Sequence, residues 1–118
     1  ASRPPPNPRL VVSRTRPARE AVEVAKRLGG ELIEMGSAGA KAMAVVRGEA
    51  EIYLHSGGQH EWDSCAPVAV AAAHGLHCSR IDGSPLIYNQ VDTYMPDLLI
   101  CRSELAERVL AEVADISS

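Results

Sequence analysis

The sequence predicts an α/β domain with a mostly parallel five-stranded sheet flanked by helices. Three observations support this prediction. Short apolar segments rich in Val, Leu and Ile alternate with stretches whose apolar residues recur at helical spacing. Glycines stand where several of the helical stretches end. The 118 residues, 46% of them apolar and 3% aromatic, suit one compact domain with a core of small aliphatic side chains.

In the amino-terminal half, two strands alternate with two helices. The Pro-rich residues 1–8 are expected to be a linker or a cut end, so that the domain spans 9–118. The apolar run 10–13 predicts a buried strand. Thr15 and Pro17 predict the start of a helix whose apolar residues recur at helical spacing: Ala21, Val24, Ala25 and Leu28. A second strand is expected at 32–35, and a small-residue helix at about 38–46.

Further strands are expected in the second half, at 52–54, 76–81 and 97–102. The polar residues 56–61 predict a loop. Asp63 predicts the cap of an Ala/Val-rich helix that ends at Gly75. Asp82-Gly83-Ser84-Pro85 is typical of a turn, and an amphipathic helix is expected from Ser103 onward.

Charge and cysteine content narrow the class of protein. The net charge is −3, although residues 1–30 carry seven basic and two acidic side chains. An acidic chain without an aromatic-rich basic stripe does not indicate a nucleic-acid polymer as partner, but leaves open a positive pocket for one phosphorylated small molecule. No apolar run reaches membrane-spanning length, so a soluble protein is expected. Three cysteines without a Cys-x-x-Cys pair favour buried free thiols and a cytoplasmic location.

Three junctions between a strand and a helix carry candidate binding residues. At the first, Arg16 lies beside a helix amino terminus, which favours anions; an ordinary capped helix with solvated arginines is the alternative. The second, Gly36-Ser37-Ala38-Gly39-Ala40-Lys41, allows close approach to the backbone, with Lys41 one helical turn in. A tight turn with Lys41 on the surface is the alternative, and the spacing is not that of a P-loop.

The third junction centres on Asp63, which follows a Gly-rich segment and the only Trp. A carboxylate held ionised at a helix amino terminus suits Mg²⁺, although a plain helix cap is the alternative. A zinc site is not expected, because the spacing of the candidate ligands is irregular: His55, His60, His74, His77, Cys65 and Cys78. No Ser/His/Asp or Cys/His catalytic order is present.

Several of these motifs resemble the carboxy-terminal half of the inositol monophosphatase superfamily. The motifs are Gly36–Lys41, Gly48, Tyr53, Gly58, Glu61-Trp62-Asp63-Ser64-Cys65-Ala66-Pro67, Asp82-Gly83-Ser84-Pro85-Leu86 and Tyr88-Asn89. Within the superfamily, the chain is most similar to the bacterial CysQ-type phosphatases, which hydrolyse 3′-phosphoadenosine 5′-phosphate. The resemblance covers about Leu10 to Val113 and implies half of an αβαβα sugar-phosphatase sandwich.

The resemblance implies Mg²⁺-dependent, Li⁺-sensitive hydrolysis of a phosphate monoester, with a role in sulfur metabolism. Asp63 corresponds to a carboxylate that binds metal beside the substrate, and is the catalytic candidate. Gly36, Ser37 and Ala38 correspond to the turn that lines the substrate. Lys41 corresponds to a lysine near the nucleotide, and Arg16 aligns loosely with a basic residue there.

The resemblance also implies that a partner is needed. The superfamily's other metal ligands lie in a Glu-Glu pair and in Asp-Pro-Leu-Asp-Gly-Thr, and neither motif occurs here; Ile81-Asp82-Gly83-Ser84 is read as a turn. The amino-terminal half of the same enzyme is therefore expected to complete the site, and these 118 residues alone are expected to be inactive. Inositol 1-phosphate or fructose 1,6-bisphosphate as substrate, a non-catalytic binding or assembly module, and a homodimer stay open.

Overall fold

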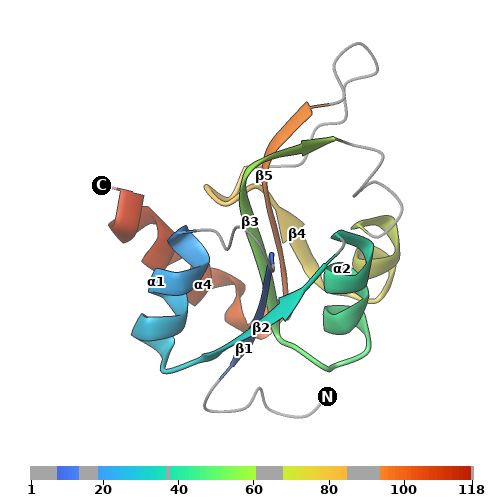
Figure 1. The fold of residues 1–118 in the computed structure, drawn as a ribbon, viewed down its shortest axis with the longest axis horizontal. Helices are drawn as coiled ribbons and strands as arrows, with labels where there is room; N and C mark the ends of the chain where they lie inside the picture. Colours follow the sequence, from blue (N-terminus) through green and yellow to red (C-terminus); the bar gives the residue numbers. More distant parts are fainter. Residues whose placement is uncertain (1–7, 14–18, 37, 61–67, 85–93, 118) are drawn as a thin grey trace.

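The computed structural model describes residues 8–13, 19–36, 38–60, 68–84 and 94–117. Within these, five strands form one sheet: β1 (Arg9–Ser13), β2 (Glu31–Met35), β3 (Ile52–His60), β4 (His77–Ser79) and β5 (Tyr94–Cys101). The helices are α1 (Arg19–Leu28), α2 (Ala38–Val46) and α4 (Ser103–Ser117), and residues 68–73 are also helical. The predicted α/β domain with a five-stranded sheet is confirmed, and Figure 1 shows helices on both sides of the sheet.

The sheet is mixed, with the strand order β2-β1-β3-β5-β4. β1 pairs in parallel with β2 and β3, whereas β5 is antiparallel to both β3 and β4. Four strands therefore run in one direction, as a mostly parallel sheet requires, and β5 runs against them. The run Leu98–Cys101 is apolar throughout and buried, so its composition gives no sign of strand direction.

Two apolar cores lie on the two faces of the sheet. On one face, α1 and α4 pack against alternate residues of β1, β3 and β5, such as Leu10, Ile52 and Leu99. On the other face, α2 and the helical residues 68–73 pack against the intervening residues, such as Val11 and Tyr53. The predicted aliphatic core is confirmed, as are helix ends near Gly29, Gly48 and Gly75, which all have positive φ.

β3 is longer than the sequence predicts. The predicted strand stops at residue 54 and a loop follows, but β3 continues to His60 and pairs with β5 as far as Tyr94. Its register shifts between Ser56 and Gln59, around two glycines that are typical of a β-bulge rather than a loop. The observed pairing of β3 with β1 includes only Ile52 and Tyr53, so the outer part of β3 and β5 extends beyond the rest of the sheet (Figure 1).

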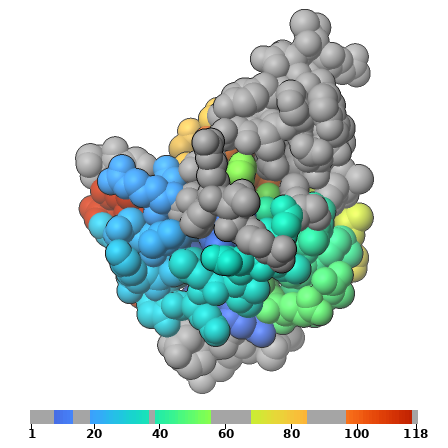
Figure 2. Space-filling model, viewed as in Figure 1, coloured from blue at the N-terminus to red at the C-terminus, as the bar shows by residue number. Residues whose placement is uncertain are grey.

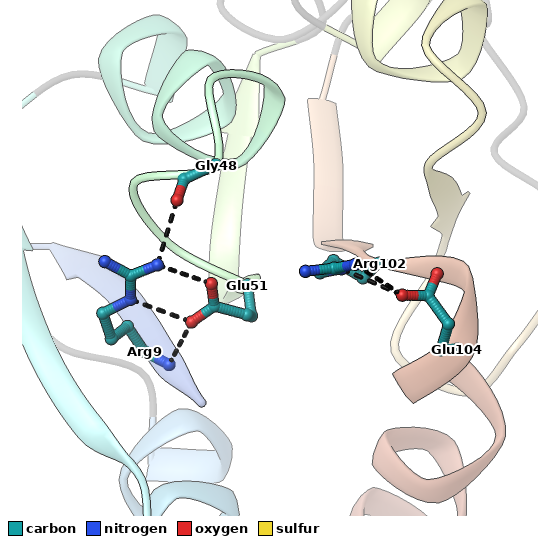
Figure 3. A network of polar contacts seen from close by, with 5 residues as sticks. All are labelled: Arg9, Gly48, Glu51, Arg102 and Glu104. Carbon is teal, nitrogen blue, oxygen red and sulfur yellow. Dashed lines mark hydrogen bonds and ion pairs between the residues drawn. The ribbon is translucent and has the colours of Figure 1, made fainter. Parts of the chain in front are cut away.

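The opposite end of the sheet is fixed by an ion pair between the partly exposed Arg9 and the buried carboxylate of Glu51. The Glu51 carboxylate, 2% exposed, accepts hydrogen bonds from the Arg9 backbone N–H at 2.8 Å, from Nε at 3.0 Å and from Nη2 at 2.7 Å. Arg9 Nη2 also donates to the Gly48 carbonyl (Figure 3). The Arg102 N–H donates to the Glu51 carbonyl. These contacts join the start of β1 to the turn that leads from α2 into β3 and to the residue before α4.

β2 is an edge strand with mostly exposed side chains, and it lies at the surface with α1 and α2 in the space-filling view (Figure 2). No helix in the described parts of the chain combines the length and apolar character that crossing a membrane requires.

Candidate functional site

Three neighbouring parallel strands run toward the same side of the sheet, where β1 and β2 end side by side and β3 continues beyond them. β1 ends at Ser13 and β2 ends at Met35, and Gly36 leads from β2 toward α2. β3 runs in the same direction and ends at His60. In open α/β sheets, ligands bind at this edge, where strands end and helices begin. The predicted junctions after β1 and β2 therefore begin side by side, because Ser13 pairs with Met35. The third junction, which contains Asp63, follows His60 in sequence.

The predicted site residues divide into two groups. Gly36 and Lys41 are described in full, and Ala38 is the first residue of α2. Arg16, Ser37 and Asp63 lie outside the described residues, so their predicted roles stay predictions. The described part of the site therefore consists of α2, the end of β2 and the face of β3 beneath α2.

Gly36 is exposed and has open space around it. Among the described residues, a Cβ added at this position would meet no atom within 4 Å, and the backbone does not have a positive φ. The fold itself therefore does not require glycine here. A bare backbone with open space is instead the surface that a ligand can approach closely.

Lys41 is the unusual residue of this region because it is buried. Its side chain is 4% exposed, and Nζ lies 5.6 Å from the centre of the Tyr53 ring. Within the described residues, no carboxylate lies within ion-pair distance of this ammonium. Burial lowers the pKa of Lys41. The alternative reading of a surface lysine is wrong.

A buried cation is costly unless an anion or a π system compensates for the lost water. The face of Tyr53 supplies part of this compensation, since the ring attracts a cation that lies over it. A helical side chain starts toward the helix amino terminus, which directs Lys41 toward the turn that follows β2. The arrangement suits an anionic group bound near that turn.

Tyr53 was expected only as part of a motif and His55 only as a rejected zinc ligand, so the contacts of Tyr53 with Lys41 and His55 were not predicted. Tyr53 is 1% exposed, and the His55 ring lies 6.5 Å from it, centre to centre. Strand residues two apart share a face, so both rings belong to the face that α2 covers. Recognising 52–60 as one strand would have placed His55 on the face of Tyr53.

The other candidate residues that are described have structural contacts. The Asp82 carboxylate accepts a hydrogen bond from the Ser84 N–H at 2.9 Å, so the predicted turn is confirmed. His74 Nδ1 contacts the Val70 carbonyl and His77 Nε2 contacts Ser79 Oγ, each at 2.8 Å. Burial raises the pKa of the Cys78 thiol and that of Cys101, the latter to about 12, as expected for unreactive core thiols.

The described residues do not by themselves form a metal site. Among them, no three His, Cys, Asp or Glu side chains lie close enough together to hold one ion. Asp63, for which the sequence predicts Mg²⁺, is not among them, so its metal-binding role stays a prediction. The geometry of the described residues bears on the binding of an anion.

The fold and site define a class: an α/β domain that presents an open glycine turn and a buried lysine near the carboxyl edge of its sheet. The chain belongs to the inositol monophosphatase family, whose family model matches residues 9–118. The resemblance noted from the sequence is thus confirmed.

Relatives of known function are similar to this chain over most of its length. The 3′-phosphoadenosine 5′-phosphate phosphatase of Mycobacterium bovis is 53% identical over 107 residues, which cover 91% of this chain and 40% of that protein. The 3′(2′),5′-bisphosphate nucleotidase CysQ of Escherichia coli K12 is 32% identical over 88 residues, covering 75% of this chain and 36% of CysQ. The chain therefore spans about two fifths of the length of these relatives.

Solved structures agree with the fold. The structure of CysQ from Bacteroides thetaiotaomicron matches with a TM-score of 0.71 and 27% identity, covering 86% of this chain and 40% of that one. Inositol monophosphatase II from Staphylococcus aureus MSSA476 matches with a TM-score of 0.75, covering 98% of this chain and 43% of that one. At 16% identity, the second match shows the fold alone.

Proposed function

We propose that this chain is the carboxy-terminal half of a Mg²⁺-dependent, Li⁺-sensitive phosphatase that hydrolyses 3′-phosphoadenosine 5′-phosphate. The observation that supports this most is the buried Lys41 ammonium, which has no carboxylate partner within the described residues and lies one helical turn beyond an open glycine turn. The 53% identity to a phosphatase named for this substrate supports the same reading. Because the described cysteines, Cys78 and Cys101, are free thiols, we place the protein in a reducing cytoplasm.

The buried cation of Lys41 favours a substrate with two phosphate groups. One phosphate of 3′-phosphoadenosine 5′-phosphate is cleaved, and the other must be held while its charge is neutralised. A lysine that is already desolvated loses little more water of its own when it binds such a group. Inositol 1-phosphate has no second phosphate, so it would leave this cation unpaired. Fructose 1,6-bisphosphate has one, which makes it the substrate to test alongside the nucleotide.

The remaining residues take complementary roles in the proposal. Gly36, Ser37 and Ala38 line the substrate with backbone, and Arg16 adds positive charge beside it. Asp63 binds Mg²⁺, which polarises the phosphoryl group and lowers the pKa of an attacking water when it is bound. A Mg²⁺ pair needs more than one carboxylate. We therefore propose that an amino-terminal half, corresponding to the part of the relatives that this chain does not span, supplies the others.

The test is phosphate release by the intact protein with Mg²⁺. The three substrates to compare are 3′-phosphoadenosine 5′-phosphate, fructose 1,6-bisphosphate and inositol 1-phosphate. The proposal expects the nucleotide to have the highest kcat/KM and expects Li⁺ to inhibit. The 118 residues alone should release no phosphate, and should regain activity with the amino-terminal half. Absence of turnover by the intact protein on all three would favour a non-catalytic binding module instead.

A further inference from the structure

We propose that Tyr53 is a positioning residue for substrate binding: its ring holds the Lys41 ammonium in place to receive an anionic group of the substrate. This inference rests on the proposed function, because it assumes that Lys41 meets the substrate. It extends that function to a buried residue, 1% exposed, that acts through Lys41 rather than by touching the substrate.

The geometry of the pair carries the inference. Lys41 Nζ lies 5.6 Å from the ring centre, within the distance at which a cation is attracted to an aromatic face. Lys41 comes from α2 and Tyr53 from the start of β3, so the contact crosses the interface between helix and sheet. Both side chains are buried, which excludes most competing water and strengthens the attraction.

The ring also restricts where the ammonium can go. Lysine has a flexible four-carbon side chain, and ordering it on binding is unfavourable. Tyr53 is fixed by the apolar cluster that contains Val11, Val45 and Ile100, and so offers a rigid support. A lysine held in advance loses less entropy when the substrate arrives, which favours binding without altering the chemical step.

The test uses the intact protein and a graded series at one position. Tyr53→Phe retains the ring, and phenylalanine with one, two or three ring fluorines has nearly the same shape but a progressively weaker negative face. The inference expects Tyr53→Phe to bind the nucleotide nearly as well as the native protein. It expects KM for 3′-phosphoadenosine 5′-phosphate to rise with each fluorine, to about tenfold with three, at nearly constant kcat.

Tyr53→Leu gives an independent variant, with Ile52→Ala as its matched control. Ile52 is buried next to Tyr53 in sequence but packs on the other face of the sheet, away from Lys41. Both variants remove buried volume, so both lower the melting temperature. Only Tyr53→Leu should raise KM for the nucleotide, and melting curves verify that each variant is folded at the assay temperature.

Lys41→Met separates the two proposals. If Lys41→Met leaves KM for every substrate unchanged, Lys41 does not meet the substrate and its role in the proposed function fails. If Lys41→Met raises KM but the fluorinated series is flat, the proposed function stands and the role of Tyr53 is overturned. Fluorinated variants at position 53 that lower kcat and leave KM unchanged would also overturn it, because a residue that only positions a binding group should affect KM.

Discussion

The guanidinium of Arg9 meets the buried carboxylate of Glu51 through two hydrogen bonds, and the Arg9 backbone N–H donates a third. Arg9 opens β1, and Glu51 immediately precedes β3 (Figure 3). The pair therefore joins two neighbouring parallel strands at the end of the sheet opposite the candidate site. Because the carboxylate is 2% exposed, it depends on Arg9 for its solvation.

Loss of Arg9 should destabilise the fold more than it affects binding. Arg9→Met leaves the Glu51 carboxylate buried without its partner, and we expect a loss of about 2–3 kcal/mol in the free energy of unfolding. Urea denaturation of the intact protein measures this loss. The control is Arg47→Met, because the Arg47–Glu49 pair is exposed and its removal should change stability by less than about 1 kcal/mol. Equal losses in the two variants would contradict the account.

The same pair predicts an acid dependence of stability. Burial acts to raise the pKa of the Glu51 carboxyl, but the hydrogen bonds and charge of Arg9 outweigh it and hold the pKa below its ordinary value of 4.5. A carboxyl whose pKa is lowered by folding stabilises the fold fully above its unfolded pKa. That contribution is lost as the pH falls through the folded pKa. Unfolding free energies below about pH 4.5 should therefore fall less steeply for Glu51→Gln than for the native protein. Parallel curves would contradict this.

A side chain at position 36 should leave the stability of the fold nearly unchanged but weaken substrate binding. In Gly36→Val the added Cβ meets no atom of the described residues within 4 Å, so the melting temperature should change little, whereas KM for the nucleotide should rise about tenfold or more if substrate lies against this turn. Gly30→Ala is the contrasting control, because its Cβ would lie 2.5 Å from the Pro8 carbonyl oxygen. That variant should lose stability. Unchanged KM in Gly36→Val would remove Gly36 from the site.

Lys41 should determine which substrate is preferred. Lys41→Ala in the intact protein removes the cation for the second anionic group, so KM for 3′-phosphoadenosine 5′-phosphate should rise about 10- to 100-fold. KM for inositol 1-phosphate should change much less, because that substrate has no second phosphate. Steady-state kinetics on both substrates measure the difference, and equal losses would remove the reason for preferring the nucleotide.

Most of the fold could be predicted from local patterns. Leu10–Val12 and Ile52–Leu54 are β-branched or aromatic-rich runs, and Ala21, Val24, Ala25 and Leu28 share one helix face, so strands and helices follow from periodicity. The direction of β5 could not be predicted. Its residues 98–101 are buried on both faces, so they lack the alternation of apolar and polar residues that is typical of an antiparallel strand. The length of β3 was missed because two glycines resemble a loop but form a bulge.

The position of the site at the turn after β2 could be predicted, whereas the burial of Lys41 could not. The strand-to-helix turn at Gly36 follows from its small residues. The burial of Lys41 could not be predicted from α2, because alanines and valines surround it on every side of the helix and mark no single apolar face. Its contact with Tyr53 depends on how α2 packs on β3, which is a tertiary property that no local spacing encodes.

The most direct test of the central claim is phosphate release from 3′-phosphoadenosine 5′-phosphate by the intact protein and by its Asp63→Asn variant, each with Mg²⁺. The account predicts turnover by the native protein and a loss of about 100-fold or more in the variant, with the fold preserved by circular dichroism. An Asp63→Asn variant as active as the native protein would contradict it.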